Sequence, residues 1–339
     1  MKKAIIVPAE EAEPVRLELL QRDLLDKYRK IKVSSKHTGE KLLEIPVKGD
    51  VDGYTIIEQK ELEYYGKWES LKERLEGVIP AEELEYVPSG WQLIGDVIIV
   101  SIPEEIDSRK ALIAKILLEM YPGCKSVIQD FGIEGQFREP KRKIVTGSQT
   151  ETIHRENQCM FKMDVMLIMY SKGNLPERKR MSMLGKDEVV VDMFAGIGYF
   201  SIPMAVYAKP EKIISIEINP VSYGYLLENI QLNHVENIIV PMNGDCAKLT
   251  PQGVADRVIM GYVGSTHHYL KQGLMAIKNG GGILHYHETT PEELLFERPV
   301  SRIRDAALEI GREVEIRECR RIKKYAPGVW HVVVDAEIS

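Results

Sequence analysis

The chain has 339 residues, of which 44% are hydrophobic and 28% are charged, and its formal net charge is −6. This composition excludes a disordered or fibrous protein, and the length predicts two or three domains. The acidic net charge argues against a surface that is basic throughout, so any contact with nucleic acid has to come from local clusters of Lys and Arg.

Neither a membrane span nor a secretory signal is predicted. No run of about 18 apolar residues occurs, and Glu10 follows the N-terminal apolar residues too soon for a signal peptide. The four cysteines lack the close spacing of zinc or dithiol motifs. We therefore expect a cytoplasmic protein with free thiols, no membrane contact and no metal site.

Apolar periodicity predicts two small α+β modules in the first half of the chain, over residues 1–65 and 66–150. In the first module we expect a helix over 10–26 and strands over 30–33 and 42–47. In the second we expect a charged helix over 67–76, a strand over 91–100 and a helix over 108–121, which Pro122 and Gly123 end.

Residues 151–339 predict a larger α/β domain. The segment 144–170 is rich in strand-forming residues, and from Glu188 onward apolar strands alternate with helices, as in a parallel sheet with crossover helices. We expect strands over 189–193, 212–216, 238–242, 256–260 and 282–287, and helices over 199–206, 220–233, 266–277 and 292–308. The pattern indicates a Rossmann-like fold.

A small-residue turn follows the first of these strands. The strand ends in Asp192, and Phe194, Ala195, Gly196 and Gly198 lie between it and the next helix. Open α/β sheets bind ligands at this edge, and glycines let a ligand approach the backbone closely. We expect Asp192 to engage the ammonium of an amino-acid ligand, directly or through water. A short glycine motif alone is weak evidence, because such turns also serve only to join strand to helix.

Two further acidic residues stand at the ends of the next two strands. Glu217, with Ile218 and Asn219 after it, is placed to bind both ribose hydroxyls of a nucleoside. Asp245, between Gly244 and Cys246, is placed to accept a hydrogen bond from an adenine amino group, although a plain Asn-Gly-Asp turn is the better explanation when this residue is taken alone. The three acidic residues together predict S-adenosylmethionine. Nicotinamide enzymes, an alternative, have a third glycine where this chain has Phe200 and Ser201.

At this point the sequence resembles the class I methyltransferase-like enzymes that modify the purine next to the anticodon of tRNA. This group contains the tRNA guanine-N1 methyltransferase and the wybutosine-pathway aminocarboxypropyltransferase. The resemblance rests on 135–140, 152–157, 174–178, 192–198 and 325–331 and covers most of the chain beyond about residue 70. It is looser in the first 65 residues, which resemble a small tRNA-recognition module. It implies that tRNA-Phe is the substrate.

One position separates the two branches. The methyltransferases carry an Asn-x-Pro-type motif after the fourth strand, whereas this chain has Met260 and Gly261, with neither the Asn nor the Pro. We expect loss of that side chain to let a different carbon of the sulfonium face the nucleophile, although drift within a methyltransferase loop is the alternative explanation. We therefore favour transfer of the 3-amino-3-carboxypropyl group to 4-demethylwyosine. Guanine-N1 methylation is the nearest alternative, and a noncatalytic tRNA-binding protein is a second.

The resemblance also implies roles for charged residues. Arg138 and Glu177 fall where the methyltransferases polarise and deprotonate guanine, and here we expect them to position the base. The amino-acid carboxylate of the donor needs a cationic partner, for which Arg178 and Arg180 are candidates beside Lys172.

Three basic runs flank the predicted site, and we expect them to contact phosphates of the tRNA. A solvated surface is the usual explanation of any single run. The residues are Lys141, Arg142 and Lys143; Lys179 and Arg180; and Arg320, Arg321, Lys323 and Lys324. We expect the protein to act as a monomer.

Overall fold

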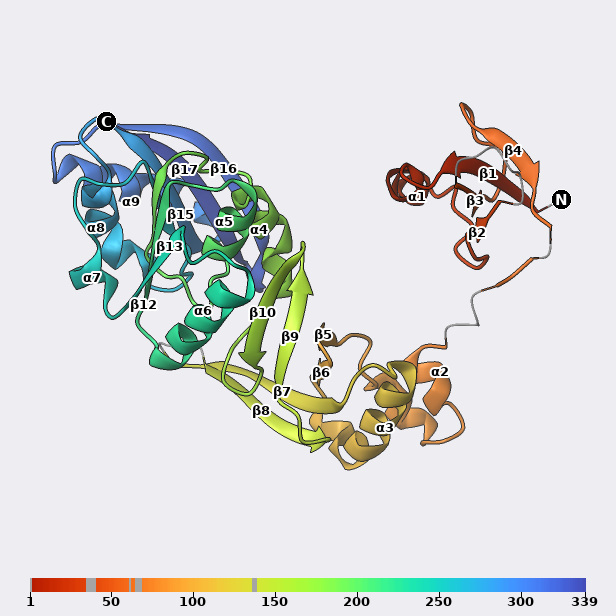
Figure 1. Cartoon of the computed structure of the whole chain (residues 1–339). Helices are drawn as coiled ribbons and strands as arrows, with labels where there is room; N and C mark the ends of the chain where they lie inside the picture. The colour runs from red at the N-terminus through yellow and green to blue at the C-terminus, as the bar shows by residue number, and fades with distance from the viewer. Residues whose placement is uncertain (1, 35–40, 61, 65–68, 136–138) are drawn as a thin grey trace. The chain divides into compact units, whose positions relative to one another are not determined.

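The computed structural model of the chain divides into two units, Met1–Val78 and Ile79–Ser339 (Figure 1). It describes residues 2–34, 41–60, 62–64, 69–135 and 139–339, so the expected roles of Arg138 fall outside the described residues. Within the described ranges, no helix is both long and apolar enough to cross a membrane.

The N-terminal unit is an antiparallel sheet with one helix packed on it. The strand order is β2-β3-β1-β4, and Ile5, Leu19 and Ile45 are fully buried in the core between α1 and the sheet. The expected helix and both expected strands are confirmed, whereas β1 and β4 were not predicted. The elements are β1 (Lys3–Pro8), α1 (Ala12–Gln21), β2 (Lys32–Val33), β3 (Leu42–Pro46), β4 (Thr55–Glu58) and α2 (Leu71–Leu75).

The larger unit begins with a four-stranded sheet of order β5-β6-β7-β8 and the β9–β10 hairpin. The single strand expected over 91–100 is two strands, because the chain turns at Gly95 and Asp96, and Gly95 has a φ of 53°. The elements are η1 (Ala81–Glu85), β5 (Gln92–Ile94), β6 (Val97–Val100), η2 (Glu104–Arg109), α3 (Lys110–Met120), β7 (Ser126–Glu134), β8 (Glu139–Thr146), β9 (Glu151–Glu156), β10 (Cys159–Asp164), η3 (Lys172–Asn174) and α4 (Leu175–Met181).

The remainder of this unit is a seven-stranded sheet of order β13-β12-β11-β14-β15-β17-β16. Strands β11 to β15 run parallel, and β17 is antiparallel to both of its neighbours. The elements are β11 (Val189–Asp192), α5 (Ser201–Tyr207), β12 (Lys212–Glu217), α6 (Pro220–Leu232), β13 (Ile239–Asn243), α7 (Cys246–Leu249), β14 (Arg257–Met260), η4 (Thr266–Tyr269), α8 (Leu270–Ala276), β15 (Gly282–Pro291), η5 (Glu292–Leu294), α9 (Glu297–Leu308), β16 (Val314–Ala326) and β17 (Val329–Ile338). The five expected parallel strands are confirmed, as is the Rossmann-like α/β class.

Helices cover both faces of this sheet, as the alternation of β11 shows. Val190 packs in the apolar cluster formed with α5 and α6, and Val191 in the one formed with α8 and α9. Successive side chains of a strand point to opposite faces, so one buried strand serves two cores. The sheet is therefore the middle layer of three.

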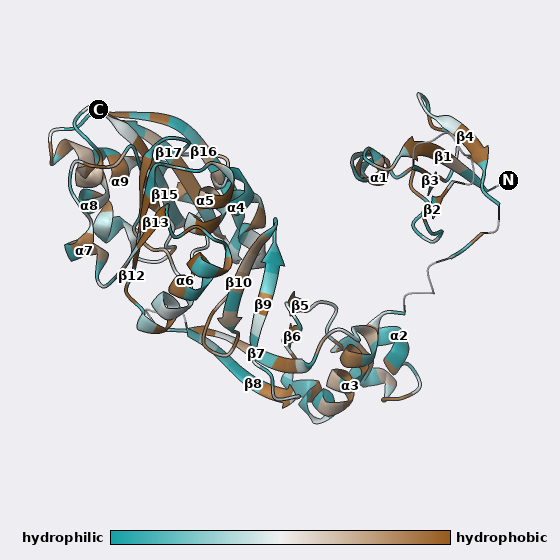
Figure 2. Cartoon of the chain, in the orientation of Figure 1, coloured by the Kyte–Doolittle hydropathy of each residue, from teal (hydrophilic) through white to brown (hydrophobic). Residues whose placement is uncertain are grey.

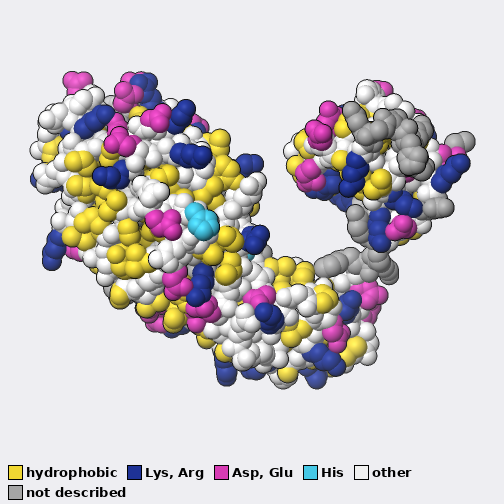
Figure 3. All heavy atoms as spheres, viewed as in Figure 1, with side chains coloured by type: hydrophobic (Ala, Val, Ile, Leu, Met, Phe, Trp, Pro, Cys, Tyr) yellow, Lys and Arg dark blue, Asp and Glu magenta, His cyan; other side chains and the backbone are white. Residues whose placement is uncertain are grey.

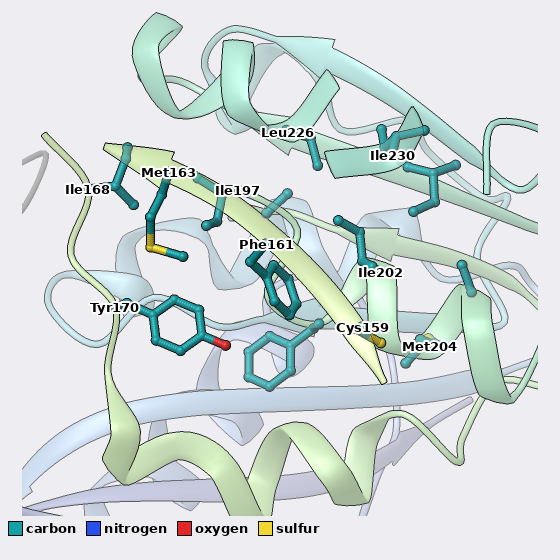
Figure 4. Packing of buried hydrophobic residues seen from close by; sticks show 14 of the residues in the cluster. Cys159, Phe161, Met163, Ile168, Tyr170, Ile197, Ile202, Met204, Leu226 and Ile230 are labelled. Atoms are coloured by element: carbon teal, nitrogen blue, oxygen red, sulfur yellow. The ribbon is translucent and has the colours of Figure 1, made fainter. Parts of the chain in front are cut away.

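The β9–β10 hairpin extends the first of these cores. Phe161 of β10 packs in the same cluster as Ile197 and Leu226 (Figure 4), and β10 is largely apolar where β9 is largely polar (Figure 2). The amide of Asn229 fastens the hairpin to α6: its Oδ1 accepts from the backbone N–H of Lys162 at 2.6 Å, and its Nδ2 donates to the carbonyl of Ile197 at 3.2 Å. The hairpin and the glycine turn after β11 are thereby held together.

Candidate active site

A pocket lies at the carboxyl ends of the parallel strands. Its wall includes Phe194 after β11, Glu217 at the end of β12, Gly244 after β13 and Gly261 after β14. Further lining residues are 167–169, 171, 174 and 178, together with Lys323 and His331 of the C-terminal hairpin. The ligand site that the sequence predicts is therefore present as a cavity.

Asp192 lies behind the pocket wall, where it shapes the turn. Its carboxylate is fully buried and accepts hydrogen bonds from the Ser201 hydroxyl at 2.7 Å and from the backbone N–H of Phe194 at 3.3 Å. Burial raises the pKa of Asp192 to about 6. Asp192 is not among the residues that line the pocket, and its expected contact with a ligand ammonium, directly or through water, stays a prediction.

Glu217 lines the pocket and also holds the turn. Its two carboxylate oxygens accept from the backbone N–H groups of Gly196 at 2.8 Å and of Asn219 at 2.7 Å. Burial raises the pKa of this carboxyl, although the backbone hydrogen bonds oppose the effect. Each oxygen of a carboxylate has a second lone pair, so both ribose hydroxyls can bind here as predicted.

The third acidic residue, Asp245, lines the pocket as the N-cap of α7. Its Oδ1 accepts from the backbone N–H of Ala247 at 2.9 Å. Cys246 and Ile218 lie on the same part of the wall. This end of the pocket, at β12 and β13, thus joins acidic side chains to apolar ones, which suits a nucleoside.

Aromatic rings form a second part of the wall. The rings of Phe194 and Tyr262 stack at a centroid distance of 5.5 Å, and Tyr269 meets Phe194 edge-on at 5.4 Å. All three line the pocket. Such rings present flat faces against which a purine or a tricyclic base stacks.

The turn after β14 holds the position at which the resemblance separates methyl from aminocarboxypropyl transfer. Gly261 lines the pocket, and a Cβ atom placed on it would come 2.7 Å from Cε2 of Phe200. A side chain at this position therefore requires the phenylalanine ring to move. Met260, in contrast, is fully buried and packs in the cluster with α8 and α9 rather than lining the pocket.

Arg178 lines the pocket, but its guanidinium is engaged inside the protein. It forms a bidentate ion pair with Glu156 at 2.7 and 2.5 Å and donates to the carbonyl of Ser171 at 2.9 Å. The guanidinium also lies over the Tyr170 ring, 4.8 Å from its centroid. This arrangement fixes the segment before α4 against β9, and the expected role of Arg178 as a carboxylate partner stays a prediction.

Glu177 is 3% exposed and belongs to a chain of charged side chains, linked through His285, that crosses β14, β15 and β17. We call this chain the buried charge network, and its members are Glu188, Arg257, His285, Asp335, Arg180 and Glu177. Arg180 pairs with Glu177 at 2.5 Å and with Asp335 at 2.8 Å. The predicted role of Glu177 in positioning the base stays a prediction, since it does not line the pocket.

The residues predicted to contact RNA fall into three groups. Lys141, Lys143, Lys179, Arg321 and Lys324 are exposed, and on the face drawn in Figure 3 basic side chains are scattered among acidic and apolar ones. Arg142, Arg180 and Arg320 have ion-pair partners inside the protein, Asp130 for Arg142 and Asp335 for the other two, and their expected contact with RNA stays a prediction. Lys323 lines the pocket.

Sequence reasoning thus located one half of the site. Five predicted cofactor residues lie behind the wall and act on its shape: Asp192, Ala195, Gly198, Asn219 and Met260. Other lining residues were not assigned to the cofactor, including Ser171, Phe200, Tyr262, Lys323 and His331. Of these five, only His331 lies in a segment on which the resemblance rests, 325–331. Among the described residues, no group of three or more His, Cys, Asp or Glu is arranged to hold a metal ion.

Three family models match successive parts of the chain. The TRM5/TYW2 methyltransferase domain matches residues 152–316, the TYW2 N-terminal domain matches 71–150, and the tRNA methyltransferase 5 N-terminal domain matches 4–55.

Relatives of two kinds are similar to the chain. A tRNA(Phe) (4-demethylwyosine(37)-C(7)) aminocarboxypropyltransferase of Methanocaldococcus jannaschii is 47% identical over 251 residues, which cover 74% of this chain and 98% of the relative. The crystal structure of P. horikoshii TYW2 in complex with MeSAdo is 40% identical with a TM-score of 0.70, covering 79% of this chain and 97% of that one. The crystal structure of Trm5b from Pyrococcus abyssi is 35% identical with a TM-score of 0.73 and covers 100% of both chains.

Proposed function

The chain belongs to the TRM5/TYW2 methyltransferase family, and from that premise we propose that it is an S-adenosylmethionine-dependent tRNA aminocarboxypropyltransferase. It transfers the 3-amino-3-carboxypropyl group of S-adenosylmethionine to 4-demethylwyosine next to the anticodon of tRNA-Phe. The relative named for this reaction is 47% identical, and the structure with MeSAdo, at 40% identity, supports the same donor.

The observation that carries the proposal is Gly261 at the pocket wall. The sequence of the methyltransferase branch implies an Asn near this position, whereas here the Phe200 ring occupies the space that a Cβ would need. The turn after β14 therefore presents backbone and an aromatic ring to the ligand. We propose that a sulfonium bound against this surface turns its amino-acid side chain, rather than its methyl group, toward the nucleophile.

The reaction forms one bond and breaks one. The ring carbon of the base attacks the γ-carbon of the amino-acid side chain, the bond from that carbon to sulfur breaks, and sulfur keeps the electron pair in 5′-methylthioadenosine. The ring carbon then loses its proton, which restores the aromatic system. A ring carbon is a weak nucleophile, so the reaction depends on in-line placement at about 3–3.5 Å.

The predicted roles of individual residues remain our proposal. Glu217 binds the ribose hydroxyls, Asp245 the adenine amino group, and the rings of Phe194 and Tyr262 shape the side of the pocket that receives the base. We also propose that residues 66–150 form a separate middle module and that the protein acts as a monomer in the cytoplasm. The four cysteines are all free, which agrees with a reducing compartment.

Guanine-N1 methylation of tRNA is the second candidate. It is favoured by one observation: the structure of Trm5b from P. abyssi covers the whole chain, including the N-terminal unit, whereas the aminocarboxypropyltransferase of M. jannaschii covers 74%. The two reactions leave different coproducts from the same donor.

Identification of the coproduct by mass spectrometry tests the proposal. Purified protein is incubated with S-adenosylmethionine and tRNA-Phe that carries 4-demethylwyosine, and in parallel with an unmodified transcript. We expect 5′-methylthioadenosine from the modified tRNA only. Release of S-adenosylhomocysteine, above all from the unmodified transcript, would identify the protein as a guanine-N1 methyltransferase instead.

A further inference from the structure

The two ends of the pocket differ in charge. Glu217 and Asp245 stand at the end formed by β12 and β13, on one side of the sheet. Lys323 belongs to β16, which is the edge strand on the other side. Because S-adenosylmethionine carries its nucleoside at one end and a carboxylate at the other, this polarity matches the donor from end to end.

Lys323 is held in a defined place by the segment before α4. Its Nζ donates a hydrogen bond to the hydroxyl of Ser171 at 2.5 Å, and Ser171 lines the pocket as well. Lys323 is only partly exposed, although the basic sequence around it is typical of a solvated surface. An ammonium has three N–H groups and can join a hydroxyl and a carboxylate at once.

Gly173 makes this position possible. A Cβ atom placed on Gly173 would come 2.5 Å from Cδ and 3.2 Å from Nζ of Lys323. The lysine stem thus runs directly along the glycine backbone on its way to the pocket. No positive φ constrains Gly173, so the close approach of the lysine is what an added methyl group would disturb.

Arg178 and Arg180, which the sequence also offered for a carboxylate, have ion-pair partners inside the protein, and the side chain of Lys172 lies outside the described part of the structure. Arg178 is 2% exposed and forms a bidentate pair with Glu156. Arg180 belongs to the buried charge network and does not line the pocket. Among the described side chains that line the pocket, Arg178 and Lys323 are the lysine and arginine present.

We propose that Lys323, positioned by Ser171 and Gly173, binds the α-carboxylate of the amino-acid part of S-adenosylmethionine. This inference rests on the proposed function for the identity of the donor. A carboxylate fixed at this end, together with a ribose fixed at Glu217, stretches the donor across the pocket. The γ-carbon between these two anchors is then held in one orientation.

The test compares two ligands, one of which lacks the amino-acid part that Lys323 is proposed to bind and has a neutral thioether in place of the sulfonium. Affinities of S-adenosylmethionine and 5′-methylthioadenosine, which lacks the amino-acid part, are measured by calorimetry without tRNA. We expect Lys323→Ala to weaken S-adenosylmethionine about 10- to 100-fold, the range for a charged hydrogen bond, and 5′-methylthioadenosine less than about twofold. Gly173→Ala, which keeps the lysine but displaces its side chain, should act in the same direction. Lys271→Ala, which removes an exposed lysine of α8, is the control.

Two results would overturn the proposal. An equal loss for both ligands means that Lys323 supports the pocket as a whole, and unchanged affinity for S-adenosylmethionine means that it does not bind the carboxylate. If the affinity for tRNA falls in that second case, the lysine contacts an RNA phosphate. Because the measurement needs no turnover, its outcome is independent of whether the coproduct experiment supports aminocarboxypropyl or methyl transfer.

Discussion

Replacing Asp335 by alanine is expected to lower the free energy of unfolding by about 3–5 kcal/mol, the range for removing one partner of a buried ion pair. Asp335 of β17 accepts from Arg180 at 2.8 Å, from Arg320 at 2.8 Å and from His285 at 2.6 Å. Without the carboxylate, the buried Nδ1–H of His285 and the guanidinium of Arg180 each lose an acceptor. Urea unfolding of both proteins measures the difference.

The position of the proton on His285 follows from the contact of its ring with Arg257. Arg257 only donates, so Nε2 of His285, 2.6 Å from its Nη1, accepts, and Nδ1 carries the proton that binds Asp335. Burial lowers the pKa of His285, which keeps the ring neutral. Asp335 is thus the acceptor on which the network converges.

A matched variant on the same strand separates burial from charge. Glu337 is also on β17 and pairs with Arg317, but both side chains are exposed, at 42% and 49%. Exposed pairs contribute about 0–1 kcal/mol, so Glu337→Ala should change stability little. If the two variants lose equal stability, the network is not the source of the effect.

The same residue makes stability depend on pH. Burial alone would raise the pKa of Asp335, but the hydrogen bond from His285 and the charge of Arg180 outweigh it and hold the pKa well below its ordinary value. A lowered folded pKa stabilises the protein above the unfolded value of about 3.9, and this contribution is lost as the pH falls through the folded value. The stability gap between the native protein and Asp335→Asn should therefore narrow below about pH 4.

Replacing Glu217 by glutamine is expected to weaken S-adenosylmethionine binding about 100-fold or more, since charged hydrogen bonds each contribute roughly 1.5–3 kcal/mol. The new amide NH₂ would face a backbone N–H, either of Gly196 or of Asn219, where the carboxylate now accepts at 2.8 and 2.7 Å. The ribose then loses one hydrogen-bond acceptor, and the backbone N–H of Gly196 or Asn219 loses the carboxylate oxygen that it now binds. Calorimetric titration with the donor measures the loss.

Glu211→Gln serves as the control, because Glu211 is exposed and directly precedes the opposite end of the same strand, β12. It should leave the affinity unchanged. Since burial raises the pKa of Glu217, affinity in the native protein should also decline with falling pH as this carboxylate is protonated, at a higher pH than for an exposed glutamate. Unaltered affinity in Glu217→Gln would remove Glu217 from the ligand site.

The sequence predicted the parallel half of the sheet and not the antiparallel half, for a physical reason. Strands such as β11, Val189–Asp192, are buried on both faces and read as apolar runs, whereas β16, Val314–Ala326, is an edge strand rich in Arg, Lys and Glu. Only pairing with β17 makes that segment a strand. Local pattern cannot report such a distant partner.

The candidate site, like the sheet, was predicted only in part from the sequence. Glu217 and Asp245 were found because strand ends in a parallel sheet share one edge, which is a rule that sequence alone can use. Lys323 was assigned to an exposed basic run, because its approach to Ser171 joins residues 152 positions apart. Asp192 was correctly placed at the end of its strand, but its burial against Ser201 depends on packing that periodicity does not specify.

A single turnover with doubly labelled donor tests the central claim most directly. S-adenosylmethionine carries one isotope in its methyl group and another in its carboxyl carbon, and the tRNA-Phe carries 4-demethylwyosine. The account predicts that the carboxyl label enters the RNA while the methyl label leaves in 5′-methylthioadenosine. Methyl label in the RNA, with carboxyl label left in S-adenosylhomocysteine, would contradict it.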